Sequence, residues 1–319
     1  MNFGIVLSSL FLFIFACVVT AESQSLVQLF VMNGSIQLTL FLFVACLPYL
    51  RTGRMSYVDI AWPFGVALIG AQVLLFAEGD AIRSTVVGCI YLFIGLRMGI
   101  GALVMGIKTG VIFKTDFPRY QYRKLMFEQS GTKHIKFHTL AEIMAQGLAN
   151  MSVLALPAFI MAVNPNGAIS NWEILGLALW AVAYVFESIA DLQKLHFISK
   201  HESGVCNIGL WRFSRHPNYF SEWLVWTGIV IATVPSWLVL QANETVFVWM
   251  IMGIGSLLAS VMLYITLVYL TGAKPAEYFS VQKRAGYKAY QETTSMFFPW
   301  FPKRRQDAQS EGSVSTVVD

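Results

Sequence analysis

The chain has 319 residues, of which 56% are apolar and 13% charged, with a formal net charge of +4. Soluble domains carry about 25% charged residues, so this composition excludes an ordinary soluble domain, a disordered chain and a coiled coil. The four cysteines and the basic residues are scattered, which argues against a disulfide scaffold, a metal site and a nucleic-acid-binding surface. The composition predicts a membrane protein with the lipid bilayer as partner, no bound metal and no obligate protein partner.

Long apolar segments follow one another along the chain, and a membrane-spanning helix needs about 20 predominantly apolar residues. Such segments lie at 3–20, 28–50, 57–77, 82–107, 139–163, 172–192, 220–240 and 245–271. We therefore expect an all-α, polytopic transmembrane bundle of about seven to eight spans. Residues 1–21 also resemble a signal peptide with a cleavage site at Ala21, but the lack of a positive charge before the apolar run favours a retained span.

The basic residues alternate from side to side of these spans. Of the 22 Lys and Arg residues, all but Arg83 and Arg97 lie on the second, fourth and sixth connections or after the last span. Lys and Arg favour the cytoplasmic side, so the C-terminus and the 108–138 connection are predicted to be cytoplasmic. The pattern is equally compatible with a bacterial inner membrane and with the endoplasmic reticulum.

Three segments follow from the composition. Residues 1–50 form N-terminal transmembrane helices, residues 51–302 form the main membrane domain, and the polar residues 303–319 form a disordered cytoplasmic tail. The long connections lie on the predicted cytoplasmic side, so chemistry is expected to face the cytoplasm.

Two ionisable residues lie at membrane depth, where each costs about 2.5–3.5 kcal/mol unless it faces a bundle interior or a cavity. Arg97 lies in the fourth span beside Gly95 and Gly99. It is either a snorkelling arginine or a contact to an anion or carbonyl in a cavity. Asp59 lies near the start of the third span, where a carboxylate also interacts favourably with the helix dipole.

The sixth span ends with Glu187, Asp191 and Lys194, whose spacing of four and three residues places them on one helix face. One interpretation is an ion-pair ladder that closes the helix end. The other is a lysine that Asp191 holds and directs at a phosphate.

The sixth connection closes with the sequence GLWRFSRHPNYFSEW, residues 209–223. Pro217 suits the first position of a helix, and backbone N–H groups before it are predicted to be free to bind an anion. Arg215 adds a planar phosphate donor beside that terminus. An interfacial belt of aromatic and basic residues is the alternative, but it does not explain the order His-Pro-Asn-Tyr.

Three further residues of this stretch have side chains suited to a nucleotide. Asn218 and Tyr219 can hydrogen-bond a ribose, an amide or a carbonyl from the first helical turn, and Trp211 offers a stacking face for a planar ring.

The stretch resembles the steroid 5-alpha-reductase-like membrane proteins, in particular their mainly bacterial branch of unknown function, and the C-terminal half of the sterol C14 and C7 reductases. Further matching pieces are SYVDIAW at 56–62, FPRY at 117–120, DLQKLHF at 191–197 and RAGYKAY at 284–290. The resemblance covers roughly residues 50–302. Ser221 departs from it, because the bacterial branch usually has Gly there.

This resemblance implies an NADPH-dependent oxidoreductase that acts on CH–CH groups. It would reduce a carbon–carbon double bond in an apolar, steroid- or lipid-like enone, with NADPH in a cytoplasm-facing cavity. Tyr219 is the first candidate for the proton donor, with Tyr57, Asp59 and Arg97 on the opposite wall. The implied cofactor contacts are Asp191, Lys194, Trp211, Arg215, His216, Asn218, Tyr219, Arg284, Tyr287 and Tyr290.

Two other functions stay open. The isoprenylcysteine carboxyl methyltransferases share the His-Pro-x-Tyr helix start but use S-adenosylmethionine. They usually carry a pair of glutamates where this chain has only Glu277 between residues 271 and 278. The third possibility is a non-enzymatic lipid-binding membrane protein, since a shared fold does not guarantee the chemistry.

Overall fold

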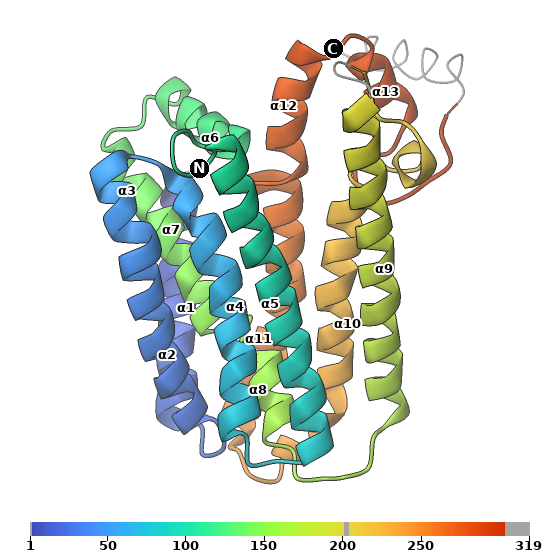
Figure 1. Cartoon of the computed structure of the whole chain (residues 1–319). Helices are drawn as coiled ribbons and strands as arrows, with labels where there is room; N and C mark the ends of the chain where they lie inside the picture. The colour runs from blue at the N-terminus through green and yellow to red at the C-terminus, as the bar shows by residue number, and fades with distance from the viewer. Residues whose placement is uncertain (1, 201–203, 304–319) are drawn as a thin grey trace, which may run out of the picture. The chain divides into compact units, whose positions relative to one another are not determined.

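The computed structural model describes residues 2–200 and 204–303, and within them the regular elements are all helical (Figure 1). The α-helices are α1 (Asn2–Glu22), α2 (Val27–Phe41), α3 (Leu47–Thr52), α4 (Val58–Phe76), α5 (Ala81–Thr109), α6 (Pro118–Gln129), α7 (Ile135–Met151), α8 (Leu156–Ala162), α9 (Asn171–Lys200), α10 (Pro217–Leu240), α11 (Val246–Ile265), α12 (Ala273–Lys283) and α13 (Tyr287–Thr293). Short 3₁₀ or π segments join some of them: η1 (Leu42–Cys46), η2 (Met55–Tyr57), η3 (Gly209–Arg212) and η4 (Thr266–Leu270). The all-α prediction is confirmed.

Seven helical stretches of the described residues are long and apolar enough to cross a membrane. They coincide with the predicted spans from 28–50 to 245–271, and the predicted first span is α1. The ends differ in two places. Helix α9 continues to Lys200, eight residues past the predicted end at 192, and the last stretch runs on through η4 and α12 to Lys283.

Contacts divide the chain into two compact units. Unit 1 comprises residues 1–176 and 229–260, and unit 2 comprises residues 177–228 and 261–319. Helices α9, α10 and α11 contribute to both. Residues 304–319, which make up most of the predicted tail, lie outside the described residues.

Helices α4 and α5 of unit 1 pack closely through glycine. A Cβ atom on Gly95 would lie 2.3 Å from the Ala67 nitrogen, and one on Gly70 would lie 2.4 Å from the Leu92 nitrogen. In lipid, where no hydrophobic force draws helices together, small residues permit the close approach that holds them. Gly95 thus lets the backbone of α4 come close to α5.

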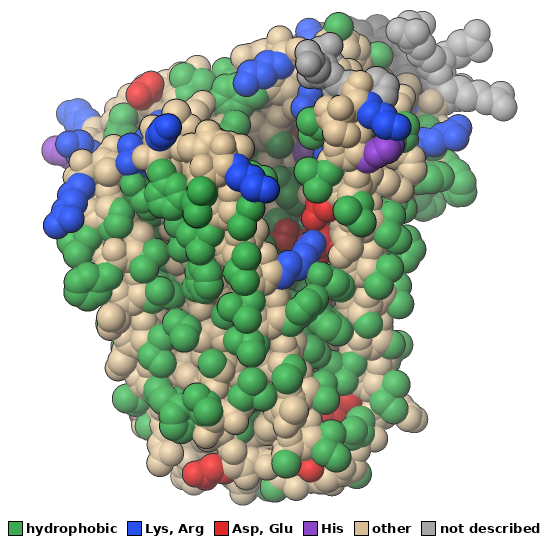
Figure 2. All heavy atoms as spheres, viewed as in Figure 1, with side chains coloured by type: hydrophobic (Ala, Val, Ile, Leu, Met, Phe, Trp, Pro, Cys, Tyr) green, Lys and Arg blue, Asp and Glu red, His purple; other side chains and the backbone are tan. Residues whose placement is uncertain are grey.

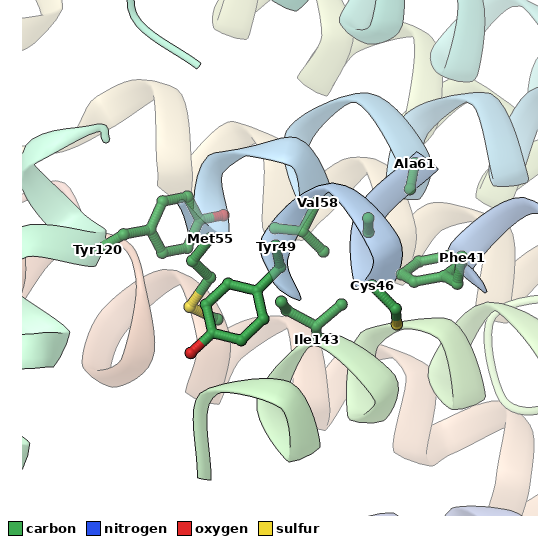
Figure 3. Packing of buried hydrophobic residues seen from close by; sticks show 9 residues of the cluster. Phe41, Cys46, Tyr49, Met55, Val58, Ala61, Tyr120 and Ile143 are labelled. Carbon is green, nitrogen blue, oxygen red and sulfur yellow. The ribbon is translucent and has the colours of Figure 1, made fainter. Parts of the chain in front are cut away.

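An apolar cluster fills unit 1 beneath α6 (Figure 3). Tyr120 reaches into it from α6, and its side chain is 1% exposed. The buried members are Phe41, Ala45, Cys46, Tyr49, Met55, Val58, Ala61, Tyr120 and Ile143. An ion pair between Arg123 and Glu142 also fastens α6 to α7. The 110–134 connection is therefore held firmly at one end of unit 1.

A cluster of buried carboxamides lies deeper in unit 1, where α7 breaks before α8. Gln37 Nε2 donates to Asn33 Oδ1 over 3.1 Å, and Asn33 Nδ2 donates to the carbonyls of Asn150 and Met151 over 3.2 and 3.1 Å. Backbone groups at membrane depth must find partners inside the protein. These side chains supply them, which explains how a span tolerates the break.

Charges mark the two ends of unit 1. Figure 2 shows Lys and Arg side chains gathered at the end that carries α6. Arg83, the one basic residue on an odd-numbered connection, is only 3% exposed and pairs with the buried Glu173. Its charge is therefore neutralised within the protein, and the alternation of exposed basic residues is sharper than the sequence alone indicates.

In unit 2, the segment 204–216 is fastened to helices on two sides. Trp211 Nε1 donates to the Ala190 carbonyl of α9 over 2.9 Å, and the Tyr290 hydroxyl of α13 donates to the Trp211 carbonyl. Gly209 has φ +54° and lies against Gln193, so a side chain there would be strained and would clash. This packing positions the motif residues before α10.

Candidate functional site

The motif helix begins as predicted, with Pro217 as the first residue of α10. The backbone N–H groups before it are not available to an anion, which corrects the expectation. The Arg215 amide donates to the Ser295 carbonyl over 2.8 Å, and the His216 amide donates to Ser214 Oγ over 3.1 Å. The chain itself satisfies these donors, because the segment after α13 folds back onto the motif.

Glu277 of α12 is the centre of the buried part of the site. Its Oε1 accepts from Arg215 Nε over 2.6 Å and lies 3.1 Å from His216 Nε2. Its Oε2 accepts from Arg215 Nη2 over 3.1 Å and from Gln291 Nε2 over 2.6 Å. Glu277, Arg215 and His216 are 7%, 8% and 6% exposed. One carboxylate thus joins α12, α13 and the motif.

Arg215 is occupied by this arrangement. Besides Glu277, its Nη1 donates to the carbonyls of Gln291 and Thr294, so four of its five N–H groups have partners. The predicted phosphate donor therefore pins the C-terminal helices to the motif in this structure.

His216 presents a neutral ring beneath Tyr219. Burial lowers the pKa of His216, and the neighbouring Glu277 carboxylate counteracts part of that shift. Because the carboxylate accepts, the proton of the neutral ring resides on Nε2. The Tyr219 ring stacks on it at 5.3 Å with an interplanar angle of 2°, and Tyr219 is half-buried. Glu277 thus orients His216, and His216 supports Tyr219.

Two cations, Lys194 and Arg284, lie near Cys206. Lys194 Nζ is 4.2 Å from the centre of the Trp211 ring. Burial raises the pKa of the nearby Cys206 thiol, and the charges of Lys194 and Arg284 act against that rise. Among the described residues, no carboxylate lies within ion-pair distance of either cation. Such a pair attracts an anion.

Trp211 is less available than predicted. It is 5% exposed, and Lys194 covers one face of its ring. Its indole supports the lysine through a cation–π contact, so the structure uses the ring as a support for Lys194 rather than as an open stacking platform.

Asn218 connects the motif helix to α9. Its Nδ2 donates to Asp191 Oδ1 over 3.2 Å. Its Oδ1 is buried and accepts no hydrogen bond from the described residues. A buried acceptor without a donor is costly, so this oxygen fits a ligand that carries an N–H or O–H group.

A cavity of about 620 Å³ lies on the α13 side of unit 2. Its polar lining comes from Asn207, Arg212, Tyr290 and Thr293. Burial raises the pKa of Tyr290, and it raises the pKa of Tyr287 to about 12. Both phenols stay protonated at neutral pH, and Tyr290 already donates its hydroxyl proton to the Trp211 carbonyl.

In unit 1, two of the matching sequence pieces meet. The Asp59 carboxylate of α4 pairs with Arg119 of α6 over 2.8 Å and accepts from the Tyr120 hydroxyl over 2.8 Å. In the same unit, Asp116 Oδ1 accepts hydrogen bonds from the Ser56 amide and from the Ser56 hydroxyl. The pieces at 56–62 and 117–120 therefore form one cluster, although about sixty residues separate them.

Tyr57 and Arg97 also belong to unit 1. The Tyr57 hydroxyl accepts from Arg54 Nη2 over 2.8 Å, and the ring is half-buried. Arg97 lies twelve residues before the end of α5 and is half-buried. Tyr219 belongs to unit 2.

Sequence reasoning missed Glu277, Arg119 and Tyr120 as site residues. Glu277 had been noticed only as a single glutamate where the methyltransferases carry two. Its signal was a lone acidic residue in the stretch 271–290, which otherwise holds only basic charges. For Arg119 and Tyr120 the signal was the FPRY piece itself.

Residues 46–294 match DUF1295, a family described as a protein of unknown function. The chain belongs to the DUF1295 family. The matched region contains every candidate site residue of both units and leaves α1 and α2 outside.

One relative is an uncharacterized protein of the fission yeast Schizosaccharomyces pombe. It is 26% identical over 173 residues, which cover 47% of this chain and 46% of the relative. The alignment thus spans a little under half the length of that relative. No solved structure matches the chain.

Proposed function

We propose that this DUF1295 protein is a membrane-embedded, NADPH-dependent reductase of a carbon–carbon double bond in an apolar enone. The resemblance to the steroid 5-alpha-reductase-like proteins supports this reaction class. The observation that carries the proposal is the pair Lys194 and Arg284, two cations without a described carboxylate partner beside the motif. Such a pair suits the phosphates of a dinucleotide.

The residues of unit 2 fit such a cofactor in a second respect. Asn218 Oδ1 is a buried acceptor that lacks a donor, and the carboxamide of a nicotinamide is a donor. Lys194 and Arg284 would hold phosphate, and Arg212 would add charge from the cavity lining. Arg215, paired with Glu277, would keep these elements together rather than bind phosphate itself.

When bound, NADPH supplies a hydride for the β-carbon of the enone. Negative charge then develops on the carbonyl oxygen of the substrate, and a proton donor must meet it. Tyr219 is the proposed donor, because its phenol carries a proton at neutral pH and its ring is held against His216. Tyr57, Asp59 and Arg97 of unit 1 stay candidates for orienting the donor or stabilising the enolate.

Thermal stability with different cofactors tests the proposal. A ligand that binds only the folded state raises the unfolding temperature, so NADPH should raise it and S-adenosylmethionine should not. The Lys194→Ala variant should lose most of the shift, whereas Lys288→Ala, an exposed lysine on α13, should keep it. A shift with S-adenosylmethionine alone would favour the methyltransferase, and no shift with either would favour a lipid-binding protein.

The orientation in the membrane is part of the proposal. We propose a cytoplasmic 108–138 connection, because exposed basic side chains gather at the α6 end of unit 1 (Figure 2). We propose a cytoplasmic C-terminus because the sequence after the last span carries seven Lys and Arg residues. A cysteine introduced as Ser130→Cys should resist an impermeant reagent added to intact cells. Labelling from outside would show that the 108–138 connection lies on the opposite side of the membrane.

A further inference from the structure

The segment after α13 displays three large aromatic side chains on the surface of unit 2. Phe298 is 50% exposed, Trp300 74% and Phe301 77%. Leu75 and Ile107, which point outward from membrane-spanning stretches, are 73% and 74% exposed. Trp300 and Phe301 are thus as exposed as side chains that lipid surrounds. A contiguous exposed aromatic patch marks an interaction surface.

This segment is fastened along its backbone. The Trp300 amide donates to the Phe213 carbonyl over 2.9 Å, and the Lys303 amide donates to the Thr293 carbonyl over 2.9 Å. Because hydrogen bonds hold the backbone at both ends, the segment is already ordered. Binding of a partner to its aromatic side chains therefore costs little further conformational entropy.

The patch lies at the level where α10 begins to cross the membrane. The Phe298 ring is 5.8 Å from those of both Phe220 and Trp223, which stand in the first two turns of α10. An aromatic side chain at the end of a span meets the boundary between headgroups and acyl chains. Trp and Phe with such neighbours suit that boundary better than bulk water.

Charge supports the same partner. Lys303 is exposed directly after the aromatic residues, and Arg304 and Arg305 follow it in the sequence. Basic residues next to interfacial aromatic side chains attract the anionic headgroups of a leaflet. A water-soluble protein partner would not account for this order of aromatic and then basic residues at the end of a span.

We propose that residues 298–303 form an interfacial anchor whose partner is an anionic lipid surface. Trp300 and Phe301 insert at the boundary between headgroups and acyl chains, and Lys303 stays at the level of the phosphates. The Ser295 carbonyl, just before the anchor, accepts the Arg215 amide. The anchor therefore holds the motif loop at the membrane surface, whatever reaction the protein catalyses.

Spin-label accessibility tests the anchor in the full chain, reconstituted in nanodiscs that contain phosphatidylglycerol. A p-acetylphenylalanine at position 300 is coupled to a nitroxide, so the native cysteines stay in place. The nitroxide should collide more often with oxygen than with a water-soluble nickel complex, as a label at Leu75 does. A label at Lys288, exposed on α13, should show the reverse preference.

Two outcomes would overturn the anchor. A label at position 300 that prefers the nickel complex as strongly as the label at Lys288 would place the segment in water. An immobile label that neither reagent reaches would mean that protein, such as a second copy of the chain, covers the patch. A label at Phe301 repeats the measurement one residue on. Both positions are exposed, so the substitutions leave the fold intact.

Discussion

Asp59 in unit 1 and Glu277 in unit 2 are both carboxylates held by an arginine and an aromatic residue, yet their exposure differs. The side chains of Glu277 and Arg215 are each 9% exposed, whereas those of Asp59 and Arg119 are 18% and 30% exposed. A desolvated ion pair is costly to break because its partner is left charged in an apolar setting. A half-exposed pair can open at little cost.

The difference in exposure indicates that the two arginine–carboxylate ion pairs have different roles. Glu277 has four nitrogen donors around its two carboxylate oxygens. Asp59 has two, and its side chain is 18% exposed. We therefore interpret the Glu277 cluster as the scaffold of the unit 2 site and the Asp59 cluster as the one that can exchange partners. The predictions below test that contrast.

The largest effect is expected for Glu277→Gln. Arg215 would keep a buried charge without compensation, so the free energy of unfolding should fall by about 3–5 kcal/mol. Thermal or denaturant unfolding in detergent measures it. Glu292→Gln, an exposed glutamate on α13, is the control and should change stability by less than about 0.5 kcal/mol. If the Glu277→Gln protein were as stable as this control, the assignment of Glu277 as a scaffold would be wrong.

The next effect concerns Tyr219, which the scaffold supports through His216. In Tyr219→Phe we expect kcat to fall on the order of a hundredfold, the scale of general acid catalysis, with NADPH affinity within about threefold of wild type. Steady-state kinetics and calorimetry separate the two, since a positioning residue would change the cofactor affinity instead. Reduction at the wild-type rate would exclude Tyr219 as the donor and direct attention to Tyr57.

Lys194→Ala should weaken NADPH binding by roughly ten- to a hundredfold, because a charge-assisted hydrogen bond contributes about 1.5–3 kcal/mol. Calorimetry with NADPH and NADH measures the loss, and Lys288→Ala is the matched control. Unchanged NADPH affinity would show that the cation pair does not bind the cofactor. Stability should fall much less than in Glu277→Gln, because Lys194 has no described ion-pair partner to leave unpaired.

Asp59→Asn tests the open carboxylate. The free energy of unfolding should change by at most about 1 kcal/mol, since the pair with Arg119 is partly exposed. If the unit 1 cluster takes part in the reaction, kcat should fall at least about tenfold, because the orientation of a reacting group is lost. A large loss of stability with unchanged kcat would reverse the roles assigned to the two carboxylates.

The smallest effect is the pH dependence of the scaffold. Burial lowers the pKa of His216 below its ordinary value of 6.5, so the unfolded state binds a proton at a higher pH than the folded state. Stability is then complete above about pH 6.5 and decreases as the pH falls from there to the folded pKa, by at most about 1.4 kcal/mol per unit. His216→Gln should remove this dependence, whereas His196→Gln, an exposed histidine of α9, should retain it.

Much of the fold could be predicted, because the signals are local. Hydropathy over about 20 residues located the spans, and Pro217 located the start of α10. The end of α9 was missed by eight residues because Lys194, His196 and Lys200 are polar enough to end an apolar run without ending a helix. Polarity marks where the bilayer ends, and hydrogen bonding decides where the helix ends.

The site was predicted only in part. The motif indicated which residues carry charge and hydrogen-bonding groups, but it did not indicate what already occupies them. Arg215 and the amides before Pro217 looked available in the sequence. The structure pairs the Arg215 side chain and amide with groups 62 and 80 residues further along the chain, and the His216 amide with Ser214 Oγ. Availability depends on long-range packing, which a linear motif does not contain.

The amino-acid sequence is enough to predict an all-helical membrane protein with basic residues on alternate connections, because both properties depend on the cost of placing each residue in lipid. Only the three-dimensional packing makes the ion pair of Glu277 with Arg215 less exposed to solvent than the ion pair of Asp59 with Arg119. The physical reason is that the worth of an ion pair depends on how far both partners are removed from water. The helices that pack around an ion pair decide how much water reaches it, and the two residues themselves do not.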